Sequence, residues 1–162
     1  YEDLLEQKGI GPVKAIQLKA VAELSRRIAR TNRGYQLQMN NPKTIADYFM
    51  EDMRHHRVEV FKGAFFDAKC NFIGSETVAK GSLSFAYVSP AELFRKALLK
   101  NAVMIVILHN HPSGDPTPSR EDLELTQQIA RGAQLLGITL ADHIVIGDNR
   151  YYSFRENHRL ET

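Results

Sequence analysis

Two histidines stand one residue apart at positions 109 and 111, directly after the apolar run 103–108. Side chains on a strand alternate between its two faces, so His109 and His111 are expected to point the same way, with Cα atoms about 7 Å apart, while Asn110 points to the other face. Two imidazoles at that spacing can reach one metal ion. Ligands of α/β sheets usually bind at the carboxyl ends of strands, so the pattern indicates a metal site at the end of this strand.

A carboxylate follows in the segment after the histidines. Ser119 is suited to be the N-cap of a helix, which places Asp122 in the first turn, facing back toward the strand end. The proline-rich turn 112–118 restricts the path between the two elements. A capping box, with aspartate in place of the usual Glu or Gln, explains Ser119 and Asp122 equally well. It does not explain the two histidines, so a metal site with Asp122 as third ligand stays open beside it.

Helical and strand patterns alternate around this segment. Apolar spacing, caps and turn residues predict helices within 8–30, 41–55, 89–101 and 119–137, and strands within 57–66, 71–81, 103–108, 138–146 and 151–154. The run 103–108 is apolar throughout, as expected of a central strand buried on both faces. We therefore predict an α/β domain, with α+β as the alternative, built on a mixed sheet flanked by helices.

The spacing of His109, His111, Ser119 and Asp122 resembles the H-x-H-x7-S-x2-D signature of the JAMM (MPN+) metalloproteases. The wider sequence resembles the RadC family, in which such a domain follows a helix-hairpin-helix element; the resemblance covers essentially the entire chain and is carried by residues 9–28, 109–126 and 141–154. It implies a JAMM/MPN-like fold with a cytidine deaminase-like arrangement of sheet and helices.

The resemblance also implies a zinc ion held by His109, His111 and Asp122. Two histidines and one aspartate leave the fourth tetrahedral position open for water, which is the pattern of a catalytic site. Zinc brings the pKa of a bound water to about 7, so hydroxide is available at neutral pH. The implied reaction is hydrolysis of an amide or isopeptide bond, with a peptide or isopeptide as substrate.

Members of the family use a glutamate on an early strand as general base. Glu59 is expected to open the first strand after the domain's first helix, and so takes this role; an outward-facing strand residue is the alternative interpretation. Glu76 is the second candidate, but it is expected after the second strand, as an exposed turn residue. The resemblance gives Ser119 the role of holding the oxyanion or the water.

Asp142 and His143 form another polar pair, inside an apolar strand. One of them could orient a metal-bound imidazole from behind. A hydrogen-bonded structural histidine is the simpler interpretation of His143.

The N-terminal segment 1–40, with a polar linker at its end, is predicted to be separate from the JAMM/MPN-like domain at 41–162. Gly9 and Gly11 form a turn before a helix, where backbone N–H groups can meet a phosphate and Lys14 adds attraction. Residues 8–33 contain seven basic side chains and one acidic, which suits DNA, although a solvated helix face explains this charge as well. Residues 1–8 supply only part of a first helix, so we expect a partial helix-hairpin-helix module.

Composition narrows the class of protein. With 43% hydrophobic and 25% charged residues, the 162-residue chain is typical of one globular domain with a small appendage. It contains no apolar run of about 18 residues, so no membrane partner is expected. The single Cys70 excludes an internal disulfide framework and a multi-cysteine zinc cluster, and suits a reducing cytoplasm, where we expect the protein to reside.

Two functions remain in competition. One is a zinc-dependent hydrolase of the JAMM type; the other is a DNA-associated repair or recombination module without hydrolase activity of its own. In one-letter code, residues 109–111 read HNH, which is also the name of a nuclease class. Members of that class take their three residues from separated positions, so the triplet does not indicate a nuclease. A barrel amidohydrolase needs about 250 residues, and a metallo-β-lactamase needs Asp-His after the pair, where this chain has Pro112 and Ser113.

Overall fold

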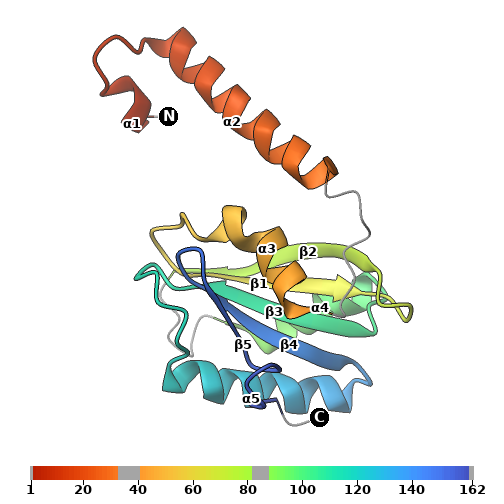
Figure 1. Ribbon diagram of the computed structural model, residues 1–162. Helices are drawn as coiled ribbons and strands as arrows, with labels where there is room; N and C mark the ends of the chain where they lie inside the picture. Colours follow the sequence, from red (N-terminus) through yellow and green to blue (C-terminus); the bar gives the residue numbers. More distant parts are fainter. Residues whose placement is uncertain (1, 33–40, 82–87, 161–162) are drawn as a thin grey trace. The chain divides into compact units, whose positions relative to one another are not determined.

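The computed structural model describes residues 2–32, 41–81 and 88–160 (Figure 1). The chain divides into two compact units, residues 1–36 and 37–162. The domain boundary predicted at residue 40 falls outside the described residues. Among the described helices, none combines the length and the apolar character needed to cross a membrane.

The smaller unit holds α1 (Glu2–Leu5) and α2 (Pro12–Asn32). Gly9 has a φ of 88°, a left-handed conformation that favours glycine, and Pro12 begins α2 as predicted. The expected apolar face of α2 is largely uncovered: Ile16 and Leu24 are 59% and 58% exposed. Within residues 2–25, Ala15 is the one fully buried side chain.

The larger unit is a five-stranded sheet with three helices. Its elements are α3 (Pro42–Met53), β1 (Val60–Phe66), β2 (Phe72–Lys80), α4 (Pro90–Leu99), β3 (Met104–Asn110), α5 (Arg120–Leu135), β4 (Thr139–Ile146) and β5 (Tyr151–Ser153). The strand order is β2-β1-β3-β4-β5. β3 and β4 are parallel and are joined through α5, whereas the other neighbouring pairs are antiparallel. This mixed α/β sheet flanked by helices confirms the predicted fold class.

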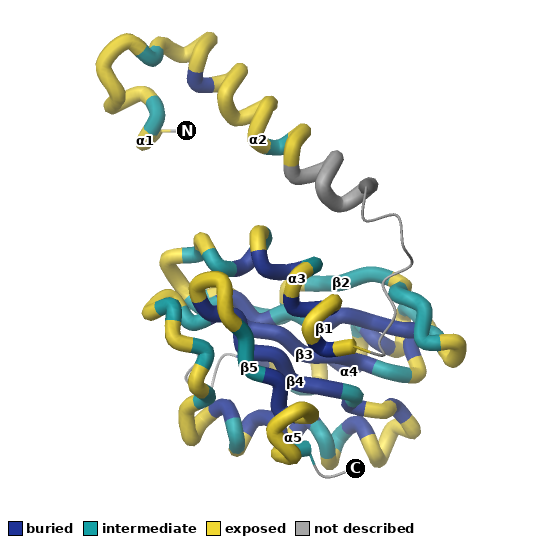
Figure 2. Tube along the Cα trace, viewed as in Figure 1, coloured by how far each residue is buried: buried dark blue, intermediate teal, exposed yellow. Residues whose placement is uncertain are grey.

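The helices cover the two faces of the sheet separately, with α3 on one face and α4 and α5 on the other (Figure 1). Along β3, Val106 and Leu108 pack with α3, while Ile105 and Ile107 pack with α4 and α5. Residues 105–110 are therefore buried throughout, as expected of a central strand (Figure 2). Because side chains alternate, His109 lies on the α5 face and Asn110 on the α3 face.

A β-bulge changes the register between β3 and β4. Ile105 pairs with Leu140, but Val106 pairs with Asp142, so Ala141 is the extra residue. As a result His143 pairs with Ile107 and lies on the same face of the sheet as His109. A regular ladder would have placed Asp142 there instead.

Candidate metal centre

His109 is the last inward-facing residue of β3 on the α5 side. Its side chain is fully buried, and its ring stacks over that of Phe61, the residue opposite it on β1, with centroids 6.2 Å apart. The next residue, Asn110, accepts from the Val60 backbone N–H at 2.8 Å and fixes the end of β3 to the start of β1. The position of His109 is thus set by the sheet.

His111 lies just beyond β3, and its loop holds it in place. Its backbone N–H donates to the Ile146 carbonyl at 2.9 Å, and its Nδ1 lies 2.8 Å from the Asp115 carbonyl oxygen. A carbonyl can only accept, so Nδ1 carries the proton of this bond. The other ring nitrogen, Nε2, is left to face His109 and Asp122.

Asp122 reaches the site from the first turn of α5, and the predicted capping box is confirmed. The Ser119 hydroxyl accepts from the Asp122 N–H at 3.1 Å. Both the Ser119 N–H and its hydroxyl donate to Asp122 Oδ2, each at 2.7 Å. This leaves Oδ1 directed at His109, so the cap also aims the carboxylate, and the two interpretations of this pair are compatible.

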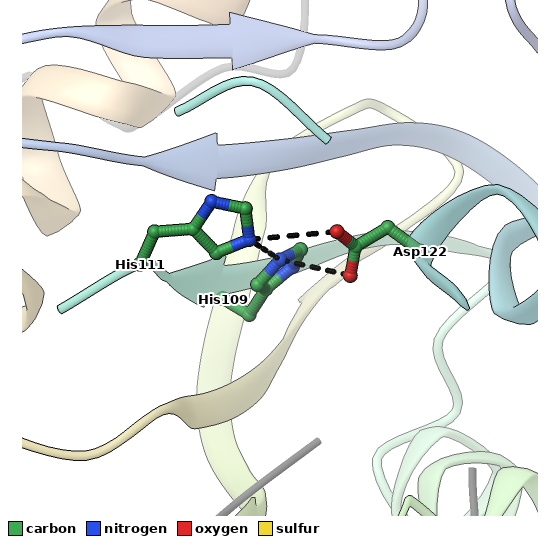
Figure 3. Close-up of side chains that lie close together, drawn as sticks. All are labelled: His109, His111 and Asp122. Carbon is green, nitrogen blue, oxygen red and sulfur yellow. Dashed lines mark hydrogen bonds and ion pairs between the residues drawn. The ribbon is translucent and has the colours of Figure 1, made fainter. Parts of the chain in front are cut away.

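The three side chains converge on one point (Figure 3). His109 Nε2 lies 3.0 Å from His111 Nε2 and 3.1 Å from Asp122 Oδ1, and His111 Nε2 lies 3.4 Å from Asp122 Oδ2. A tetrahedral zinc ion with bonds of about 2.0–2.1 Å has ligand atoms about 3.3–3.4 Å apart. The separations between the residues are close to this value, and one ligand atom from each lies within 4.8 Å of the others, so these residues can hold a metal ion.

Electrostatics favour a cation at this point. Burial opposes ionisation of Asp122, but hydrogen bonds from His109, His111 and Ser119 hold the pKa of its carboxyl far below the ordinary value. The hydrogen bond to Asp122 raises the pKa of His111, and the charge of Glu59 contributes to the same effect. A buried carboxylate beside two imidazoles provides the charge and ligand types of a divalent-metal site.

An open cleft of about 470 Å³ gives access to the cluster. It is lined by Glu59, His111, Pro112, Ser113, Ser119, Glu121 and Asp122. Glu59 directly precedes β1, which begins at Val60, so the prediction that Glu59 opens this strand was wrong by one residue. Its carbonyl accepts from the Gly81 N–H at 2.9 Å. Glu59 and Ser119 therefore share one cleft with two of the three candidate ligands.

Glu76 does not reach this cleft. It lies inside β2 and not after it, so the predicted turn position was wrong. Its carboxylate forms an ion pair with Lys100 Nζ at 3.0 Å, and this hydrogen bond lowers its pKa. Glu76 is a partly exposed structural carboxylate.

The residues predicted to contact DNA lie in the smaller unit. Gly9 and Gly11 have open space where a side chain would be. Lys14 Nζ donates to the Gly9 carbonyl at 3.4 Å, and Lys14 is exposed. The turn and the lysine are therefore adjacent, as the sequence predicted.

Asp142 and His143 are neighbours in β4, but their side chains contact different groups. Asp142 accepts from the Ser153 hydroxyl at 2.6 Å and from the N–H groups of His143 and Arg155 at 2.7 and 2.9 Å. Burial raises the pKa of Asp142 to about 6 against these bonds. His143 instead contacts His109, and burial lowers its pKa well below the ordinary value, so the ring is neutral.

Sequence reasoning missed Thr126. It is buried on α5, one turn after Asp122, and its hydroxyl lies 2.6 Å from His143 Nδ1. The only local signal is its spacing of four residues from Asp122, which puts both side chains on one face of the helix.

Comparison with known proteins agrees with this geometry. Residues 39–160 match the family of RadC-like JAB domains. A UPF0758 protein of Caldanaerobacter subterraneus subsp. tengcongensis is 41% identical over 96% of this chain and 66% of its own length. A UPF0758 protein of Desulfitobacterium hafniense is 42% identical over 95% of this chain and 68% of its own length.

The chain thus spans about two thirds of the length of these relatives. The matched region contains the sheet, the three flanking helices and all the residues of the cluster. With a mixed α/β sheet of this topology, a family match over most of its length and relatives above 40% identity, the chain belongs to the RadC family and has a JAB/MPN-like fold.

Proposed function

We propose that the larger unit is a zinc-dependent hydrolase that cleaves an amide or isopeptide bond in a peptide substrate. The observation that carries the proposal is the convergence of His109, His111 and Asp122 beside a cleft that also holds Glu59. A zinc ion bound there supplies a Lewis acid and makes hydroxide available at neutral pH. Two histidines and one carboxylate would supply three of the four ligands that zinc takes, and water would be the fourth, as hydrolysis requires.

Glu59 is the general base in this proposal. It lines the same cleft as Ser119, and in this role its carboxylate takes a proton from the attacking water and returns it to the leaving amine. The start of β1 fixes its backbone through the Gly81 N–H.

Ser119 has two tasks. In the metal-free arrangement its hydroxyl donates to Asp122 Oδ2 and holds the carboxylate in place. Rotation about one side-chain bond turns the same hydroxyl toward the cleft, where it donates to the oxygen that gains negative charge in the transition state.

The decisive experiment compares wild type, Glu59→Gln and His109→Ala on a panel of peptide and isopeptide substrates with zinc present. Glu59→Gln should retain zinc and lose hydrolysis by about 10²- to 10⁴-fold, because only the proton transfer is removed. His109→Ala should lose both zinc and activity. Hydrolysis by Glu59→Gln at the wild-type rate rules out Glu59 as the base, and absence of zinc from the wild-type protein in native mass spectrometry rules out the metal site.

We also propose that the smaller unit contacts DNA through the turn Gly9–Gly11 and Lys14. The specific support is that α2 has no acidic residue in its first turn and that the turn before it is open. Binding of a fluorescent duplex should weaken in Lys14→Ala and in residues 41–162 alone. Equal binding by all three proteins contradicts this role.

A further inference from the structure

A chain of buried hydrogen bonds runs from His109 away from the cleft and into the core. His109 Nδ1 lies 2.8 Å from His143 Nε2, and His143 Nδ1 lies 2.6 Å from the Thr126 hydroxyl oxygen. That hydroxyl lies 2.5 Å from the Asp122 carbonyl oxygen. His109 and His143 are fully buried and Thr126 is 2% exposed, so the groups bond to one another without access to bulk water.

The contact between Thr126 and Asp122 determines which group donates and which accepts along this series of hydrogen bonds. A carbonyl oxygen can only accept, so the Thr126 hydroxyl must donate its proton to the Asp122 carbonyl. The Thr126 oxygen is then an acceptor toward His143, whose proton lies on Nδ1.

The same reasoning extends to His109. The His143 side chain is fully buried, which favours the uncharged ring with one N–H, and with that proton on Nδ1 its Nε2 is an acceptor. The N–H between the two rings therefore belongs to His109 Nδ1. His109 Nε2 faces His111 and Asp122, so it is the nitrogen that would bind a metal after giving up any proton it shares with them.

Packing holds the imidazole rings in this orientation. The His143 ring stacks on Phe154, with centroids 4.6 Å apart and planes 18° apart, and the edge of Phe61 meets it from another side. The backbone of His143 is tied through its carbonyl, which accepts from the Phe154 N–H at 2.9 Å. A 180° ring flip of either histidine would break the hydrogen bonds on both sides of it.

We propose that Thr126 and His143 are positioning residues that fix His109 in its Nδ1–H tautomer, with the Asp122 backbone carbonyl as the group that orients the chain. Asp122 then serves the site twice: its carboxylate faces the ion, and its carbonyl determines which nitrogen of His109 is free. The inference rests on the proposed metal site, but the hydrogen bond from His109 Nδ1–H to His143 does not need a metal.

The test uses Thr126→Val, which keeps the branched shape without the hydroxyl, and Thr126→Ser, which keeps the hydroxyl, as its matched control. Long-range ¹H–¹⁵N correlation spectra of the metal-free proteins report which ring nitrogen carries a proton. Wild type and Thr126→Ser should both show Nδ1–H for His109 and His143. In Thr126→Val the series of hydrogen bonds has lost its orienting acceptor, so His109 should lose its Nδ1–H in part or all of the molecules.

Zinc competition titrations give the second measurement. Thr126→Val should bind zinc about 10- to 100-fold more weakly, the usual effect of losing the group that supports a histidine ligand, while Thr126→Ser should bind like wild type. Absence of a His109 Nδ1–H signal from the wild-type protein overturns the inference, as does wild-type zinc affinity in Thr126→Val. If the wild-type protein binds no zinc, the proposed function fails, while the metal-free spectra still decide the direction of the chain.

Discussion

Replacement of Gly147 by alanine tests whether the contact between Gly147 and the loop after His111 holds His111 in position. Gly147 follows β4, and its Cα lies against the loop that carries His111. A Cβ at this position would lie 2.8 Å from Pro116 Cδ and 3.1 Å from the Gly114 carbonyl carbon. Nonbonded carbons prefer about 3.5–4.0 Å, so the loop must retreat by at least about 0.7 Å.

The loop cannot absorb this movement locally. The Gly114 carbonyl accepts from the Asp148 N–H at 2.9 Å, and the next residue, Asp115, accepts from His111 Nδ1 at 2.8 Å. Metal sites tolerate ligand displacements of about 0.2 Å, so a shift of this size should displace His111 Nε2 from its productive position. We expect Gly147→Ala to lower the free energy of unfolding by about 1–3 kcal/mol, as for other overpacked sites, and to weaken zinc binding about 10- to 100-fold.

Gly132→Ala is the matched control. Its Cβ would also overlap a neighbour, at 2.7 Å from Phe94 Cε2, but it lies ten residues along α5 from Asp122, about 15 Å away. Urea unfolding measures the stability of both variants, and a chelator competition measures zinc affinity. Gly132→Ala should keep wild-type zinc affinity whatever its stability. Wild-type affinity in Gly147→Ala would refute the argument that this contact positions His111.

Three further outcomes are expected. Ser119→Ala removes the N-cap of α5 and should lower the free energy of unfolding of the metal-free protein by about 1 kcal/mol; an unchanged urea midpoint would contradict the capping role. Zinc at 100 times its dissociation constant should raise the free energy of unfolding of wild type by about 2.7 kcal/mol and leave His109→Ala unaffected; an equal shift in the variant would place the ion elsewhere. Burial raises the pKa of Asp142 from 3.8 to about 6, so the folded state retains a proton that the unfolded chain releases, and this stabilisation is present below pH 4 and lost as pH rises through 6. Between pH 4 and 7 wild type should therefore lose about 3 kcal/mol relative to Asp142→Asn in paired urea titrations; parallel pH profiles would show that the carboxyl is not perturbed.

Local patterns brought the three candidate ligands together, and the family resemblance indicated that they hold a metal. Strand alternation placed His109 and His111 on one side, and the N-cap of α5 placed Asp122 opposite them, because each rule acts within a few residues. Glu59 required the family resemblance, since its approach to the cleft depends on the pairing of β1 with β3, which lies some fifty residues away.

The supporting residues were harder to predict for a physical reason. His143 reaches His109 only through the bulge at Ala141, and Thr126 is identified only when α5 is packed against β4. Neither feature leaves a periodic trace in the sequence. The exposed apolar residues of α2 show a different limit. Helical periodicity predicts that a helix has an apolar face, but not whether another element packs on that face.

The bulge at Ala141 also means that the register of β4 against β3 determines which side chain supports His109. If β4 paired with β3 in a regular ladder with Ala141 in place, the carboxylate of Asp142 and not the His143 imidazole would lie next to Ile107 on the face of His109. A carboxylate can accept a hydrogen bond from His109 Nδ1–H without a further orienting group, and it adds negative charge, as in other zinc sites. Thr126 would then no longer be needed to orient the His109 proton.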